Sequence, residues 1–156
     1  MIEQEELRTL IPHSGKMLML DRVIDYDIEH SILAEYNITE NCIFYDPVLG
    51  GVPAWVGFEF IAQTISALTG IRKRARKEKP NIGFILSIPS MRMDIPFFKN
   101  GSLAEIHVKE SYCTDMIYTF EGEIFLENKK VMEGKLMVME VSDEQQERLI
   151  GGAEIN

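Results

Sequence analysis

Residues 53–77, PAWVGFEFIAQTISALTGIRKRARK, predict one long helix around which the rest of the chain is organised. Gly50 and Gly51 break the chain before it, and Pro53 suits a first helical turn because its missing N–H would be unpaired there anyway. Between residues 54 and 71 the apolar side chains fall on all sides, which is typical of a helix enclosed by protein. The remaining residues should therefore form a layer that encloses it.

Glu59 is the first candidate functional residue, because it interrupts this apolar helix. Glu59 and Gln63 are four residues apart and share one helix face, which Ser66 and Gly70 continue. A carboxylate buried without a partner is costly, or it takes up a proton and its pKa rises. Glu59 is thus a candidate for proton transfer. A structural acid hydrogen-bonded to nearby backbone is the alternative, and the helix alone favours neither.

A membrane span over residues 52–71 is another alternative, since about 20 mostly apolar residues suffice to cross a bilayer. We disfavour it because Glu59 lies near the middle of the stretch. The residues that follow also alternate between apolar and polar side chains, as in the strands of a water-soluble sheet. We therefore expect no membrane span.

The composition fits one domain in a reducing compartment. The chain has 156 residues, of which 46% are hydrophobic, enough for a single core. We place this core domain at about residues 10–141 and a polar tail at 142–156. Cys42 and Cys113 make no disulfide framework or metal set, and the N-terminus has no apolar secretory core. We expect a cytoplasmic protein without a metal or cofactor.

The net charge of −9 conceals a basic segment. Residues 72–79, RKRARKEK, hold six of the 16 basic residues and one of the 25 acidic ones, which leaves ten basic against 24 acidic residues elsewhere. The chain outside residues 72–79 is therefore strongly acidic, which argues against nucleic acid as a partner. The basic segment either complements the dipole at the helix C-terminus or attracts an acidic protein, and both interpretations stay open.

The rest of the chain predicts about six antiparallel strands. They are residues 17–28, 32–38, 83–93, 104–109, 118–126 and 131–141. In the first, Leu18, Leu20, Ile24 and Tyr26 should share one face. Pro89 cannot donate a ladder hydrogen bond, so its strand should be bulged or lie at an edge. A curved antiparallel sheet wrapped around one helix buries these elements, and its open edges favour a homodimer.

Three stretches of the sequence carry a resemblance to a known family. They are IPH at 11–13 followed by MLMLDRV at 17–23, FEFIAQ at 58–63, and FILSIPSMRMDIPFFKNG at 84–101. Together they resemble the 3-hydroxyacyl-(acyl carrier protein) dehydratases of the FabA/FabZ type over residues 10 to about 141. The closest similarity is to the aryl-polyene, ApeP-like branch, whose D-x-x-G-x-x-P-x-W-x-x-x-E-x-x-A-Q pattern is matched with slightly different spacing by Asp46, Gly50 or Gly51, Pro53, Trp55, Glu59, Ala62 and Gln63.

This resemblance implies an α+β hotdog fold, in which a curved antiparallel sheet wraps one long central helix. It also implies dehydration of a 3-hydroxyacyl thioester held on an acyl carrier protein, in fatty-acid or aryl-polyene biosynthesis, with Glu59 as a catalytic acid. FabZ-type enzymes carry a second catalytic group, a histidine in a GHFPG loop fourteen residues before the acid, where this chain has Tyr45. His30 and His107 are predicted to be solvated, which leaves His13 as the candidate catalytic histidine.

The chemistry of dehydration suggests roles for further residues. Glu59 would protonate the departing hydroxyl, and amides at Gly51 and Val52 would polarise the thioester carbonyl. Tyr45 and Asp46 would line the substrate pocket, and Gln63 would hold Glu59 or a water molecule. The residues expected to dock an acidic carrier protein with its pantetheine-linked substrate are Arg72, Lys73, Arg74, Arg76 and Lys77.

Two other functions remain open for the same fold. A thioesterase would use Glu59 or Gln63 to direct water at the thioester carbonyl. A non-catalytic subunit would complete a heterodimer with a related, histidine-bearing hotdog chain, and the missing loop histidine favours this reading.

Overall fold

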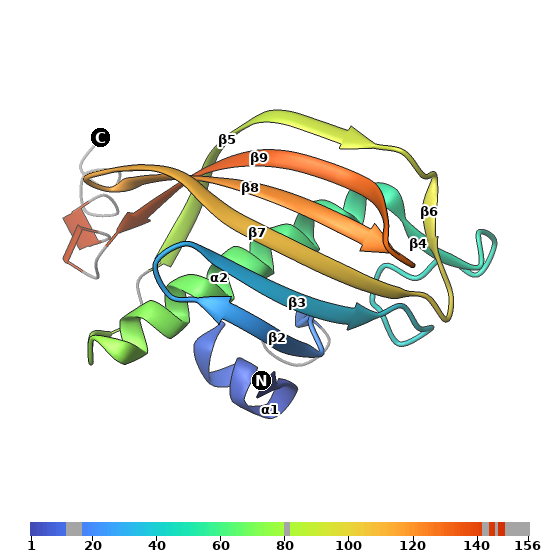
Figure 1. Cartoon of the computed structure of the whole chain (residues 1–156), viewed down its shortest axis with the longest axis horizontal. Helices are drawn as coiled ribbons and strands as arrows, with labels where there is room; N and C mark the ends of the chain where they lie inside the picture. Colours follow the sequence, from blue (N-terminus) through green and yellow to red (C-terminus); the bar gives the residue numbers. More distant parts are fainter. Residues whose placement is uncertain (12–16, 80–81, 142–143, 146, 149–156) are drawn as a thin grey trace.

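The computed structural model describes residues 1–11, 17–79, 82–141, 144–145 and 147–148. Its centre is helix α2 (Gly57–Ala75), which a curved sheet wraps on one side (Figure 1). The sheet has the order β1-β2-β3-β7-β8-β9-β5, and all its pairings are antiparallel. These strands are β1 (Ile2–Glu3), β2 (Arg22–Asp27), β3 (Ser31–Asn37), β5 (Ile82–Met93), β7 (Leu103–Thr114), β8 (Ile117–Leu126) and β9 (Lys129–Val141). The predicted sheet around one helix is confirmed.

Smaller elements surround the two ends of α2. Helix α1 (Gln4–Leu10) packs beside it, and β4 (Gly51–Pro53) pairs with β6 (Phe97–Lys99) in a separate two-stranded sheet. A 3₁₀ turn, η2 (Ala54–Val56), leads from β4 into α2. The prediction that the helix begins at Pro53 was wrong, because Pro53 pairs with Phe97 in β4 and has an extended ψ of 142°.

The predicted strand at 17–28 is shorter in the structure and has a different inward face. Only residues 22–27 form a strand, and its pairing with β3 shifts between Val23 and Asp25. Val23 pairs with the buried Ala34 and is itself fully buried, whereas Ile24 has no partner in the register with β3 and is only partly buried. A prediction that assumes strict alternation misses a bulge, because a bulge inserts one residue and switches the sheet face on which the following side chains lie.

Helix α2 is not enclosed on all sides by its own chain. The side that faces the sheet is buried and includes Phe60, Ile61 and Leu68. The opposite side is only half-buried, and it carries Phe58, Glu59, Ala62, Ser66 and Thr69. Although the helix is long and apolar enough for a membrane span, 67% of its most apolar stretch is buried inside the protein, as in the core helix of a folded domain.

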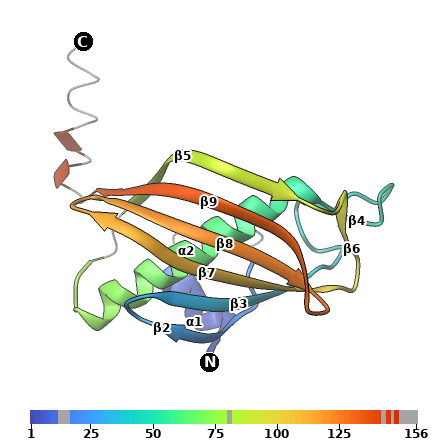
Figure 2. The same cartoon turned by 45° about the horizontal axis from the view of Figure 1, so that its top comes forward.

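Strand β5 forms one edge of the sheet (Figure 2), and its sequence is rich in apolar residues. Its register against β9 shifts twice between Ile85 and Ser90, around Pro89. The predicted edge position and bulge are therefore both confirmed. Consecutive apolar side chains here remain 42–47% exposed, and they are Phe84, Ile85 and Leu86. The predicted tail at 142–156 lies outside the described residues except for 144–145 and 147–148.

A glycine on β8 sets how closely α2 approaches the sheet. The Cβ that an alanine would add at Gly122 would lie 2.5 Å from Cγ2 of Ile61, well inside van der Waals contact. Gly122→Ala should therefore lower the free energy of unfolding by about 1–3 kcal/mol, as overpacked cores do. Urea denaturation measures this change.

Gly83→Ala is the matched control for Gly122→Ala. Its added Cβ would lie 3.4 Å from Val138, an ordinary contact, so its effect should stay within about 0.5 kcal/mol. Equal losses from the two variants would show that the helix does not rest on Gly122.

Candidate active site

Glu59 lies in the first turn of α2, on the half-buried side of the helix. Glu59 is partly exposed because the sheet covers only the opposite side of the helix. The positive end of the helix dipole favours negative charge at this position. The site acid is therefore reachable from the side of α2 that the described residues leave open.

Gln63, one turn further along, fixes the Glu59 carboxylate. Its Nε2 donates to Oε1 of Glu59 at 3.2 Å and to the carbonyl of Met17 at 2.7 Å, while its Oε1 accepts from the amide of Met19 at 2.6 Å. The side-chain amide is fully buried and uses both donors. These bonds fix the orientation of the amide and tie residues 17–19 to the helix beside Glu59.

Asp46 and Tyr45 belong to the loop before β4. The Oδ1 atom of Asp46 accepts from the amide of Val48 at 2.8 Å and from that of Leu49 at 3.4 Å, which closes a turn. Tyr45 is half-buried against the core. The structure gives Asp46 a role in shaping the loop, and the predicted contact of both residues with substrate stays a prediction.

The amides at the start of β4 are engaged in local structure. The Gly51 amide donates to the carbonyl of Asp46 at 3.3 Å, and Val52 pairs with Phe98 and is fully buried. A side chain at Gly51 would place its Cβ 2.1 Å from the carbonyl oxygen of Phe98, so only glycine permits this approach. Gly51 thus holds the loop against β6, and its amide is not offered to a ligand.

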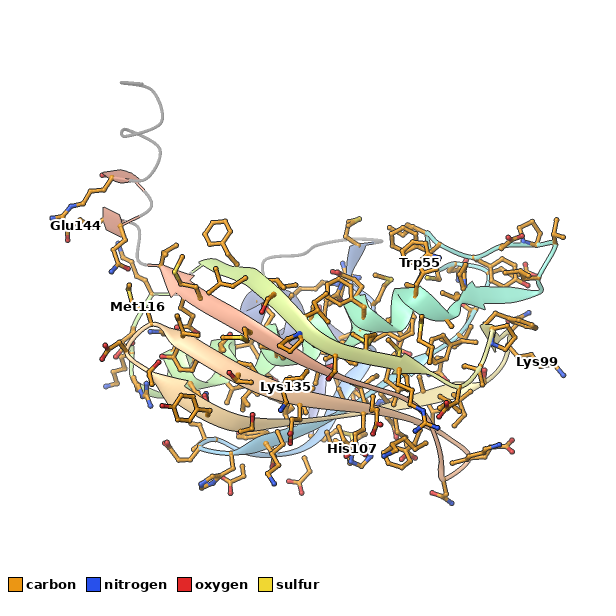
Figure 3. The ribbon with its side chains drawn as sticks, turned by 90° about the horizontal axis from the view of Figure 1, so that it is seen from above. Trp55, Lys99, His107, Met116, Lys135 and Glu144 are labelled. Carbon is orange, nitrogen blue, oxygen red and sulfur yellow. The ribbon has the colours of Figure 1, made fainter. Side chains whose placement is uncertain are left out.

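The two histidines that the structure describes, His30 and His107, do not lie at the start of α2. His13 lies outside the described residues. His30 sits in the β2–β3 turn with a side chain 73% exposed, and His107 lies on the outer face of β7 with its side chain 45% exposed, far from the start of α2 in Figure 3. The prediction that His30 and His107 are solvated is confirmed. Among the described residues, no group of His, Cys, Asp or Glu side chains is placed to hold a metal ion.

Arg72 does not belong to the exposed basic surface. It is only 7% exposed, its guanidinium binds Glu110 through two nitrogens at 3.3 and 3.1 Å, and it donates to the carbonyls of Ile28 and Glu29. These bonds clamp the last turns of α2 to the β2–β3 turn and to β7. The expectation that Arg72 meets a carrier protein is therefore wrong for the chain in this conformation, because the side chain is buried and four of its five N–H donors are bonded within the fold.

The other basic residues differ in how free they are. Lys73 lies 2.9 Å from a carboxylate oxygen of Glu78, and its ammonium holds the pKa of that carboxyl below its ordinary value. Arg74 pairs with Glu6 at 2.8 Å. Arg76 and Lys77 are exposed, and neither makes an ion pair with another described residue. They are the members of the predicted docking set that remain free to bind.

The helix with its acid, the curved sheet and the anchored glutamine together fit a known family. The sequence model described as ApeP-like, ApeP dehydratase, matches residues 5–149, nearly the whole chain. The chain belongs to the ApeP-like dehydratase family.

Curated relatives of this ApeP-like chain are 3-hydroxyacyl-[acyl-carrier-protein] dehydratases named FabZ. The FabZ of Helicobacter pylori strain G27 is 27% identical over 143 residues, covering 86% of this chain and 88% of the relative. The FabZ of Methylobacterium sp. strain 4-46 is 24% identical over 137 residues, covering 86% and 82%. The suspected resemblance to FabZ-type dehydratases is confirmed.

Solved structures confirm the hotdog fold of the ApeP-like chain. The dehydratase heterocomplex ApeI:P from Xenorhabdus doucetiae contains a chain with a TM-score of 0.85 and 24% identity, covering 92% of this chain and 96% of that one. A hypothetical thioesterase from Streptococcus pneumoniae TIGR4, solved with coenzyme A, reaches a TM-score of 0.60 at 9% identity, covering 78% and 85%. Dehydratases and thioesterases thus share this fold, and the site must distinguish them.

One residue of the ApeP-like motif was not selected as a site residue from the sequence. Trp55 is 58% exposed and lies four residues before Glu59. The available signal was a tryptophan one turn from the helix acid, since tryptophan is enriched at interfaces.

Proposed function

We propose that this chain is a subunit of a dehydratase that acts on 3-hydroxyacyl thioesters carried by an acyl carrier protein, in fatty-acid or aryl-polyene biosynthesis. The observation that carries the proposal is Glu59, held by Gln63 on the open side of α2. Membership of the ApeP-like dehydratase family and the FabZ relatives support the reaction type. A cytoplasmic location remains part of the proposal.

Glu59 serves as the proton donor to the departing group. A base removes the α-proton, the C–O bond breaks, and the hydroxyl leaves as water with the proton of Glu59. The double bond forms between the α and β carbons. The proton held by the base then returns to Glu59, so that substrate becomes enoyl product and water with no net proton change. Gln63 keeps the carboxyl directed at the hydroxyl, and its hydrogen bond strengthens as Glu59 becomes a carboxylate.

The base comes from a histidine that the loop of this chain does not supply. Tyr45 stands where FabZ-type enzymes have their histidine, and a phenol is a poor base at neutral pH. His13 is one candidate, and a histidine of a second hotdog chain is the other. The half-buried side of α2 and the apolar edge of β5 favour a second chain, because both are surfaces that such a partner would cover.

The test is to offer the purified chain a 3-hydroxyacyl carrier protein, first alone and then with a histidine-bearing hotdog homologue. Mass spectrometry of the acyl group distinguishes a 2-enoyl product, 18 Da lighter by the loss of water, from free acid. Turnover by the chain alone would support His13, and turnover only in the mixture would support a heterodimer. Release of free thiol without enoyl product would replace the dehydratase with a thioesterase.

Docking of the carrier protein depends on the exposed end of α2. Arg76→Glu combined with Lys77→Glu should weaken carrier-protein binding about tenfold at low ionic strength, because the acidic partner is then repelled. The difference should shrink as salt screens the charges. Titration calorimetry at two salt concentrations measures both effects.

Lys109→Glu with Lys135→Glu is the matched control for this charge reversal, since these lysines lie on the outer face of the sheet. If the Arg76 and Lys77 variant bound the carrier protein with unaltered affinity, the docking role would be excluded. The basic segment would then only complement the dipole at the C-terminus of α2.

A further inference from the structure

Trp55 is a fixed aromatic surface beside the candidate site. It is the single tryptophan of the chain and is 58% exposed. Its indole meets the ring of Phe44 edge-on, with centroids 5.6 Å apart and planes at 68°. Phe44 is itself partly buried against the core and therefore holds the indole from one side. The ring stays at the surface in a defined position.

Trp55 and Glu59 lie on the same side of the helix. The 3₁₀ turn that contains Trp55 runs directly into α2, and residues four apart on a helix are neighbours on its surface. Figure 3 shows Trp55 at the border of the molecule, where the loop enters α2. From there the half-buried side of the helix continues through Glu59 to Ala62 and Ser66. A chain bound along this side passes the indole next to the acid.

We propose that Trp55, backed by Phe44, determines acyl specificity by stacking on a planar, conjugated acyl chain. The inference rests on the proposed function, because it places the acyl group at Glu59. A conjugated or aryl group presents a flat π surface that an indole stacks on, whereas a saturated chain offers only apolar area. Phe44 contacts the indole from one side, and the 58% exposure of Trp55 leaves part of the ring open for such stacking. Glu59 then acts on a substrate aligned one turn away.

The principal rival is that Trp55 anchors the second hotdog subunit, since tryptophan is enriched at the centres of protein interfaces. The two roles predict different results. An anchor supports assembly and affects all substrates alike, whereas a stacking surface affects conjugated substrates alone and leaves assembly unchanged.

The binding test uses the full chain in a Glu59→Gln background, so that no turnover occurs. The ligands are amide analogues of acyl-pantetheine that carry either an 8-carbon saturated chain or a 5-phenylpentadienoyl group. Trp55→Leu should weaken binding of the phenylpentadienoyl ligand about tenfold and that of the saturated ligand less than twofold. Trp55→Phe should retain most of the preference. Tyr112→Leu, which removes a 64% exposed aromatic ring on β7, should change neither affinity.

The kinetic test uses the assembly that shows dehydration. The ratio of kcat/KM for a conjugated substrate to that for a saturated one should fall about tenfold in Trp55→Leu, with the mass of the assembly unchanged by light scattering. Equal losses on both substrates, no loss on either, or a smaller assembly would each overturn the proposal. Selective binding without turnover by any assembly would keep the role of Trp55 while removing the proposed dehydration.

Discussion

Glu59→Gln should abolish dehydration while leaving the fold and assembly intact. General acid catalysis contributes about 10²–10⁴-fold to rate, so turnover of a 3-hydroxyacyl carrier protein should fall at least a hundredfold. The glutamine still offers an oxygen to the Nε2 atom of Gln63, and the network that holds residues 17–19 is therefore preserved. Enoyl product measured by mass spectrometry gives the rate, and the thermal unfolding midpoint reports the fold.

Glu105→Gln is the control for this experiment, because it removes an acid from the outer face of β7. It should turn over at the rate of the unaltered chain. Undiminished activity in Glu59→Gln would exclude Glu59 from the mechanism and leave only the hotdog shape.

Arg72→Met should lower the free energy of unfolding by about 3–5 kcal/mol, the usual result of breaking a buried ion pair. The substitution leaves the carboxylate of Glu110 and the carbonyls of Ile28 and Glu29 without their donors. Urea denaturation measures the loss, and Arg76→Met, at an exposed position on the same helix end, should stay within about 0.5 kcal/mol.

A second substitution separates the buried charge from simple loss of packing. Adding Glu110→Leu to Arg72→Met should recover part of the stability, because the pair is then removed entirely and no unpaired charge stays buried. Destabilisation by Arg72→Met no greater than that by Arg76→Met would mean that the clamp contributes nothing to the fold.

The helix, the sheet and the Glu59 and Gln63 pair follow from periodicity and spacing. The burial of Arg72 was also within reach, since it continues the buried side of α2 after Leu68 at a spacing of four. The basic composition of residues 72–79 concealed this, because composition does not tell which side chain turns inward. The register of β2 could not be predicted from the sequence, because the bulge at Ile24 depends on pairing with β3. Strands β4 and β6 are too short to show a period.

Function was predictable to the level of family and no further. The FEFIAQ stretch carries the acid and the amide, which are local in sequence. A second proton-transfer group, which the proposed dehydration requires, would come from a distant segment or another chain, and spacing cannot reveal it. The open side of α2 could not be predicted from the sequence, because it depends on which side of the helix the sheet covers.

The exposed β5 edge affects how such a chain survives in a cell. Three successive apolar side chains, Phe84 to Leu86, lie exposed on an edge strand that has a neighbouring strand, β9, on one side only, and such an edge is a template for aggregation. A single copy released from the ribosome is therefore prone to aggregate until another surface covers that strand. Under the proposed assembly with a second hotdog chain, balanced synthesis of the two subunits would set the soluble yield, independent of any chemistry at Glu59.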